Sequence, residues 1–176
     1  ATGLPMDLML YYSGDISDTA NFDVRTIMDL FLVDDGADWR KCFSSIDMKG
    51  ANLTSEQDQY HSRRDEPSWN IGPNMQFYRV LSFLDQTPSF SNEEGIMYYM
   101  EADNKPIAEN WLDTIVGEIE ATRPFSVLGG LYSGHNWNTY PGDDIITPSL
   151  RHHLNGNAVY NVGHPVIQHM LSLFTD

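Results

Sequence analysis

The sequence predicts an α/β fold with a mostly parallel central sheet and helices on both of its faces. Short apolar runs alternate with stretches in which apolar residues recur every three or four positions, a pattern typical of alternating strands and helices. The run Ile96–Met100 carries no charge, as expected of a strand buried on both faces in a parallel sheet. With 176 residues, 41% of them hydrophobic, we expect a single domain over residues 1–176.

The first expected strand is Leu8–Tyr12, which the turn residues 13–15 end. Asn21 is expected to cap a helix, because its side chain can accept a hydrogen bond from the first helical turn. Apolar residues from Val24 to Phe31 follow at helical spacing, and residues 34–36, Asp-Asp-Gly, close this helix.

A second, weaker strand is predicted at Cys42–Ile46, with Asp47 at its end. Because Cys42 lies in an apolar run, we expect it to be a packed core thiol. A single cysteine excludes an internal disulfide. Residues 48–69 are polar and show no period, which predicts a long loop that is either functional or an insertion.

Two helices are expected around the strand Ile96–Met100. Gly72-Pro73 opens the first, because proline is favoured in the first helical turn, and an apolar stripe runs from Phe77 to Leu84. Residues 88–92 are expected to form a loop before the strand. The second helix follows Asn110, where apolar residues again recur at helical spacing.

The last third of the chain begins where Pro124 is expected to end the second helix. Phe125–Gly129 is a fourth strand candidate. Residues 129–149 are rich in Gly, Asn, Asp, Pro and Tyr and are expected to form a long loop over the site. His164-Pro165 leads into a final amphipathic helix, whose apolar face runs from Ile167 to Phe174.

The net charge of the chain narrows the classes of partner that we expect. It carries 25 acidic residues against 10 Lys and Arg, a formal net charge of −15. A surface of this sign repels phosphate backbones, so we expect no nucleic-acid partner. No apolar run approaches the roughly 18 residues that span a bilayer. Asn52-Leu53-Thr54 is an N-glycosylation sequon, which points to a glycoprotein of the secretory pathway (Golgi or ER lumen) or the extracellular space.

Two acids, Glu101 and Asp103, follow directly after the apolar run Ile96–Met100. In open α/β sheets, ligands bind beyond the carboxyl ends of the strands, so these side chains are expected where a ligand would lie. Carboxylate oxygens suit Mg²⁺ or Mn²⁺, which take the rest of their ligands from substrate phosphates and water. The sequence therefore predicts a metal site; the alternative is a loop in which both acids face water.

Other residues are predicted to bind the cofactor or ligand at the same edge. Asp15 and Asp47 each follow an expected strand. Trp111 could stack on a sugar or a base. The turn Asn155-Gly156-Asn157 offers amide groups and exposed backbone donors.

One group of segments resembles a known family, the nucleotide-diphospho-sugar transferases of the GT-A type. The segments that carry the resemblance are Phe77-Tyr-Arg79, Tyr98-Tyr-Met-Glu-Ala-Asp103, Pro106, Asn110-Trp-Leu-Asp113 and His153-Leu-Asn-Gly-Asn-Ala-Val-Tyr160. The resemblance covers roughly residues 72–174. It implies a sugar-nucleotide donor, a divalent metal, and an acid-x-acid motif matched by Glu101 and Asp103, with Glu101 in place of the usual Asp.

The resemblance implies a metal-dependent transfer of a sugar from a nucleotide-diphosphate sugar to a glycan, protein or lipid acceptor. Asp143, Asp144 and His164 are the candidates for a general base, on chemistry alone. Members of this type commonly carry a further metal-binding and catalytic segment where this chain ends, so a C-terminally truncated domain is one interpretation.

Two alternatives stay open. A catalytically inactive domain of the same type could serve as a structural subunit of a larger protein assembly, with its acidic surface facing a basic partner. A carbohydrate-binding module that uses Trp137 and Tyr140, without metal, is the third hypothesis.

Overall fold

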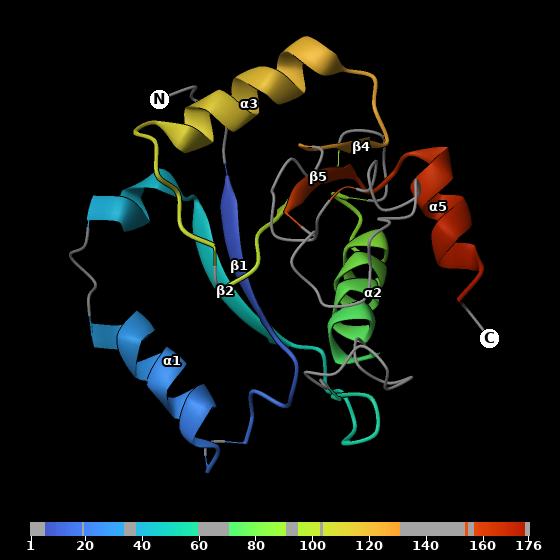
Figure 1. Cartoon of the computed structure of the whole chain (residues 1–176). Coiled ribbons are helices and arrows are strands. Elements are labelled where there is room, and N and C mark those ends of the chain that lie inside the picture. Colours follow the sequence, from blue (N-terminus) through green and yellow to red (C-terminus); the bar gives the residue numbers. More distant parts are fainter. Residues whose placement is uncertain are drawn as a thin grey trace, which may run out of the picture. The chain divides into compact units, whose positions relative to one another are not determined.

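A computed structural model describes residues 6–18, 20–33, 38–59, 71–90, 95–102, 104–130, 154 and 157–174. It is of mixed α/β type, which confirms the fold class at that level. Figure 1 shows its helices and strands. Contacts divide the chain into two compact units, Ala1–Phe83 and Leu84–Asp176, which are described separately below. In the described segments, no helix has the length and apolar character needed to span a membrane.

Unit 1 is built around two parallel strands, β1 (Asp7–Tyr12) and β2 (Ser45–Gly50). Their register pairs Asp7 with Ser45 and Tyr12 with Gly50. Helix α1 (Phe22–Val33) follows β1. The Oδ1 atom of Asn21 accepts hydrogen bonds from the N–H groups of Asp23 (2.9 Å) and Val24 (3.4 Å), which confirms the predicted cap.

The prediction of a strand at Cys42–Ile46 is wrong in its position. Asp38–Cys42 forms a short 3-10 helix, η1, in which the rings of Trp39 and Phe43 pack edge to face with centroids 6.4 Å apart. Sheet pairing starts only at Ser45, so Cys42 is exposed and is not a core thiol. The strand β2 also includes residues 48–50, which had been assigned to the polar loop.

Unit 2 contains a three-stranded antiparallel sheet, which corrects the expectation of a mostly parallel one. Strands β3 (Ile96–Tyr99), β5 (Ala158–Asn161) and β4 (Val127–Leu128) lie in the order β3-β5-β4. Both neighbours of β5 run antiparallel to it. The charge-free run at β3 does not discriminate between parallel and antiparallel pairing, because a buried strand is apolar in either kind of sheet.

One face of this sheet packs against helix α3 (Trp111–Thr122), which begins just after Asn110 as predicted. The core here consists of buried Ile119, Phe125 and Val159 with partly buried neighbours from β3, β4 and α3, namely Ile96, Tyr98, Leu128 and Ile115. Removing this much apolar surface from water is the main stabilising contribution available to so small a sheet. It also brings the start of α3 close to β3, where the rings of Trp111 and Tyr98 lie 6.1 Å apart.

Two more helices carry the predicted apolar stripes. In α2 (Ile71–Asp85), Leu81 and Leu84 are buried. In α5 (Pro165–Ser172), Ile167 and Leu171 are buried, whereas Phe174 lies beyond the helix and is exposed. Gln168 of α5 donates a hydrogen bond to the Asp85 carboxylate (2.6 Å), which ties the end of α2 to α5.

Candidate functional site

The end of β3 is held by a side chain that is distant in the sequence. The backbone N–H of Glu101 donates to Oδ1 of Asn157 (2.8 Å), and Nδ2 of Asn157 donates to Oε2 of Glu101 (3.1 Å). Asn157 directly precedes β5, and β3 and β5 are paired, so these residues meet where the two strands leave the sheet. One amide therefore fixes both the backbone and the carboxylate of Glu101.

A pocket of about 360 Å³ lies beside this pair. Its polar lining residues are Asn104, Lys105, Thr114 and Asn157. Its apolar and aromatic lining residues are Tyr98, Met100, Pro106, Ile107, Ala108, Trp111 and Ile115. The volume is at the lower end of the range for small-molecule sites, large enough for a sugar or a base.

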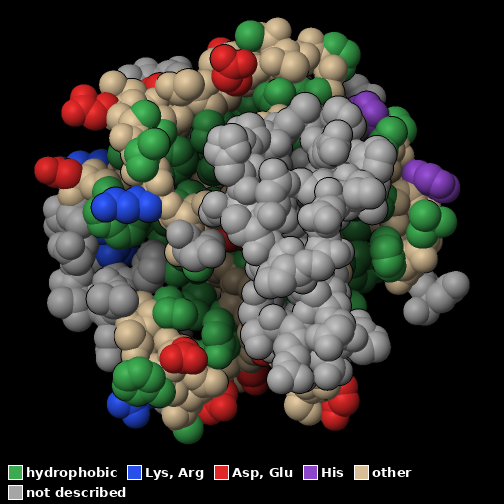
Figure 2. All heavy atoms as spheres, viewed as in Figure 1, with side chains coloured by type: hydrophobic (Ala, Val, Ile, Leu, Met, Phe, Trp, Pro, Cys, Tyr) green, Lys and Arg blue, Asp and Glu red, His purple; other side chains and the backbone are tan. Residues whose placement is uncertain are grey.

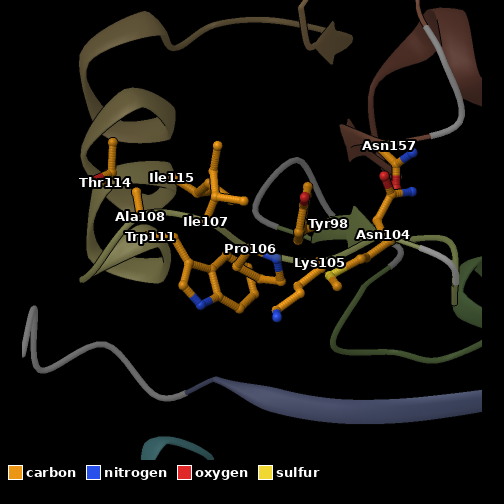
Figure 3. Close-up of a pocket in the computed structure, with 11 residues that line it drawn as sticks. Tyr98, Asn104, Lys105, Pro106, Ile107, Ala108, Trp111, Thr114, Ile115 and Asn157 are labelled. Atoms are coloured by element: carbon orange, nitrogen blue, oxygen red, sulfur yellow. The ribbon is translucent and has the colours of Figure 1, made fainter.

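Figure 3 shows how three elements contribute to this pocket. Trp111, Thr114 and Ile115 come from the first turns of α3, and Asn157 comes from the opposite end of the view. The segment 104–108 runs between them and supplies Pro106 and Lys105. The pocket thus lies wholly in unit 2.

The aromatic wall of the pocket depends on how α3 begins. Asn110 adopts a left-handed conformation (φ 55°), which asparagine tolerates better than most residues. This turns the chain so that Trp111 is the first helical residue. Its ring lies 6.1 Å from that of Tyr98, tilted by 55°. The predicted ligand-binding residue Trp111 does line a pocket.

On the opposite face of the sheet, two tyrosines lie near the Glu101 carboxylate. Burial raises the pKa of Tyr99, and the negative charge of Glu101 raises it further. Burial also raises the pKa of Tyr160, with smaller contributions from Tyr99 and Glu101. Both phenols are therefore neutral near pH 7.

The two aspartates predicted to line the same edge, Asp15 and Asp47, belong to unit 1. Asp15 follows β1, where its Oδ1 accepts hydrogen bonds from the N–H and hydroxyl of Ser17, both at 2.7 Å. These bonds lower the pKa of Asp15. Asp15 thus has a local structural role in the turn.

The expectation that Asp47 ends a strand is wrong. Asp47 lies within β2, opposite Met9, and its carboxylate pairs with Lys49 at 3.0 Å. The hydrogen bond from Lys49 is the main reason for the lowered pKa of Asp47. The strand begins three residues later than the predicted one, and this shift moves Asp47 away from the strand end.

His164 has a structural contact that the sequence interpretation did not foresee. It is the N-cap of α5, and its Nδ1 accepts a hydrogen bond from the N–H of Val166 at 3.2 Å. The other general-base candidates, Asp143 and Asp144, lie outside the described residues, as do Asp103, Asn155 and Gly156. Trp137 and Tyr140 lie outside them as well.

Of the two residues predicted to hold a metal, Glu101 and Asp103, only Glu101 lies within the described segments. Glu101 is exposed, and a carboxylate bonded by one amide keeps further lone pairs for a cation. No group of three or more His, Cys, Asp or Glu side chains that could hold a metal occurs in the described segments. A Mg²⁺ or Mn²⁺ site that uses one or two carboxylates and substrate oxygens is chemically compatible with Glu101.

Lys105 is the pocket residue that the sequence interpretation missed. It lies two positions after Asp103 and was passed over because it belongs to no motif.

No family model, curated protein or solved structure matches the chain. The chemistry of the pocket is therefore interpreted from its own residues.

Proposed function

We propose that unit 2 binds a nucleotide-diphosphate sugar in the pocket beside β3, with a divalent cation at Glu101 and Asp103, as in a metal-dependent glycosyltransferase-like domain. The observation that carries the proposal is the grouping of Trp111 and Asn157 on the wall of one pocket, with Glu101 hydrogen-bonded to Asn157. Three residues selected for ligand binding from separate parts of the sequence thus gather at one site.

The residues that line the pocket favour a ring-shaped ligand. Trp111 and Tyr98 offer aromatic surface, which favours a sugar or base ring. Asn104, Thr114 and Asn157 offer hydrogen-bonding groups, which fix orientation and provide specificity.

The carboxylates supply the part of the site that meets the diphosphate. A bound Mg²⁺ or Mn²⁺ would supply Lewis-acid assistance to the departure of the nucleoside diphosphate. Asn157 holds the Glu101 carboxylate in one orientation through its amide, so this ligand oxygen is positioned before the cation arrives. The aromatic and amide groups of the pocket orient the sugar for attack by an acceptor hydroxyl.

Isothermal titration with a panel of uridine and guanosine diphosphate sugars, with and without Mn²⁺, tests the proposal. We expect heat of binding for at least one donor, and we expect it to be larger with Mn²⁺. The double variant Glu101→Gln, Asp103→Asn should lose the Mn²⁺-dependent part. Glutamine keeps an oxygen that can accept the Asn157 hydrogen bond, so folding should survive.

The matched control is Glu120→Gln, an exposed acid on α3 that does not line the pocket. It removes one charge from the same unit and should bind as the unchanged protein does. An absence of binding for every donor, with and without Mn²⁺, would refute the proposal. Equal loss in the control would mean that general charge, not the site, governs binding.

A second function, a structural subunit of a larger assembly, is favoured by one observation. Unit 2 exposes large apolar side chains at Ile107, Val166, Leu173 and Phe174. Hydrophobic side chains are also visible among the charged ones in Figure 2. Three of these four side chains lie on or directly after α5, and a contiguous apolar patch marks an interaction site more often than scattered groups do.

Sedimentation of the purified chain, alone and with cell extract fractions, separates the two functions. Under the subunit hypothesis, Val166→Ser and Leu173→Ser abolish a specific complex, and Glu101→Gln leaves it intact. Under the sugar-nucleotide hypothesis, the serine variants leave donor binding unchanged. A monomer that binds no partner and whose donor binding needs Glu101 contradicts the subunit hypothesis.

A further inference from the structure

The charge at the pocket has the opposite sign from that of the chain as a whole. The chain has a formal net charge of −15, with 25 acidic residues. Among the described lining residues of the pocket, Lys105 is the only charged one, and it is positive. Lys105 is exposed at the wall of the pocket, so its charge attracts anions and dissolved salt screens that attraction.

The other two lysines of the chain are used differently. Lys41 pairs with Asp38 at 2.6 Å, and Lys49 pairs with Asp47 at 3.0 Å. Each is thereby neutralised by a carboxylate of its own unit. Within the described parts of the chain, the Lys105 ammonium forms no ion pair. None of the described carboxylates therefore neutralises the charge of Lys105 at the wall of the pocket.

We infer that Lys105 is the phosphate contact of this pocket, so that the pocket selects a phosphorylated sugar or a nucleotide over a neutral sugar. This inference rests on the proposed function and names the class of ligand and a residue that distinguishes it. Lysine is a common point-charge partner for phosphate. Its long stem lets the ammonium follow the phosphate of a ring that packs on Trp111.

The arrangement in Figure 3 supports this division of roles. Trp111 comes from the start of α3 and Lys105 from the segment 104–108; both side chains reach the lower side of the view, and Asn157 lies at the other end of the pocket. A ring against Trp111 would have Lys105 beside it and the Asn157–Glu101 pair farther along. The Glu101 carboxylate repels an anion, so Lys105 offsets that repulsion when no cation is bound.

A consequence follows for metal dependence. Because Lys105 holds phosphate without a cation, some binding of phosphorylated ligands should persist in a chelator. That residual binding should be sensitive to salt, because an exposed charge pair is screened. Binding that requires both Lys105 and the cation should be tightest at low salt with Mn²⁺.

The test is titration calorimetry of the whole chain with uridine diphosphate, glucose 1-phosphate and glucose, each in Mn²⁺ and in EDTA. The variants are Lys105→Gln, Lys105→Arg and the matched control Lys41→Gln, whose lysine lies in unit 1. Lys105→Gln should weaken the phosphorylated ligands roughly tenfold or more, as expected for a lost charge-assisted hydrogen bond. Lys105→Arg should retain most of the affinity, and Lys41→Gln should retain all of it.

The outcomes separate this inference from the proposed function. If the unchanged protein binds uridine diphosphate and Lys105→Gln binds it equally well, the inference is wrong and the sugar-nucleotide site stands. Glucose binding as tight as glucose 1-phosphate binding would overturn the inference too. If the unchanged protein binds none of the phosphorylated ligands in either buffer, both proposals fail. Circular dichroism of Lys105→Gln guards against a loss caused by unfolding.

Discussion

An acid follows an apolar strand in each unit, and the two ends are built differently. After β1 in unit 1, Asp15 is bonded by Ser17, two positions later, and the backbone around it closes through hydrogen bonds such as Leu53 N–H to Ser13 O (2.9 Å). After β3 in unit 2, Glu101 is bonded by Asn157, 56 positions later. A pocket opens beside that second pair and is lined by Asn157 itself.

The difference shows that an acidic side chain at a strand end can be bonded either by its own turn or by a residue distant in the sequence. Where a nearby hydroxyl and N–H can reach the carboxylate, the acid becomes part of the turn and its pKa falls. Where the partner comes from a distant strand, the acid is held at the meeting point of several elements. In unit 2, a pocket lies between the end of β3 and the start of α3.

The largest expected effect tests whether the two units unfold independently of each other. Ile167 is 2% exposed, so Ile167→Ala should lower the free energy of unfolding of unit 2 by about 2–5 kcal/mol. We expect amides of β5 to lose hydrogen-exchange protection while amides of β1 keep theirs. Chemical denaturation and exchange mass spectrometry measure the two quantities.

The control is Val166→Ala on the same helix, where the side chain is 58% exposed. It should change the free energy of unfolding by no more than about 0.5 kcal/mol. Equal loss of protection in β1 and β5 of the Ile167 variant would contradict the division into separate units.

The second effect concerns Gly95, which directly precedes β3 and lies close to the backbone of Phe90. A Cβ at buried Gly95 would overlap the backbone of Phe90, including its carbonyl oxygen, and backbone atoms yield little. Gly95→Ala should therefore cost about 1–3 kcal/mol of stability and disturb the strand that carries Glu101.

Gly117→Ala is the matched control, because a Cβ at Gly117 meets nothing within 4 Å and the residue lies in α3. Alanine there should stabilise the protein by roughly 0.5–1 kcal/mol, since it has the higher helix propensity. Thermal unfolding of both variants measures the contrast. A Gly95→Ala protein as stable as the original would be incompatible with the close approach to Phe90.

The third effect tests the long-range pair directly. Asn157→Asp keeps the oxygen that accepts the Glu101 N–H but replaces the donor to Oε2 with a second carboxylate. We expect a loss of about 1 kcal/mol at pH 7, because the two negative charges repel and a hydrogen bond is lost.

Adding Glu101→Gln to this variant should restore most of the stability, because the repulsion disappears. Urea denaturation at pH 7 of the unchanged protein, both single variants and the double variant gives the double-mutant cycle for this pair. If the second substitution restores nothing, the pair does not act through charge.

The smallest effect concerns the local pair in unit 1. The hydrogen bond from the Ser17 hydroxyl is the largest cause of the lowered pKa of Asp15, so Ser17→Ala should raise that pKa toward its ordinary value. A carboxyl whose folded pKa is lowered stabilises the fold above its unfolded pKa, near 4, and that stability is lost as pH falls through the folded value. The variant should therefore lose less stability on acidification.

A pH titration followed by NMR measures the pKa of Asp15. The pKa of Glu56, which is lowered mainly by a hydrogen bond with Thr54, is the internal control and should not move. An unchanged Asp15 pKa in Ser17→Ala would show that the local hydroxyl is unimportant.

Features encoded within a few residues were predicted from the sequence. The strand at Leu8–Tyr12, the cap at Asn21 and the helix after Asn110 all occur where expected. Capping needs one side chain two or three positions from its partner, and a helix buries the stripe that its own spacing creates. Trp111, which the sequence predicted to stack on a ligand, lines the pocket, and its role in binding stays a prediction.

The arrangement of the strands was decided only by the tertiary structure. The central strand β5 was not anticipated, and the direction of β3 was wrong, because pairing depends on which distant segments meet and apolar runs do not encode it. The same pairing brings Asn157 to Glu101 and positions α3 so that Lys105 and Trp111 line one recess. The sequence determined which side chains are chemically suited to a ligand, and long-range packing decided which of them lie close together.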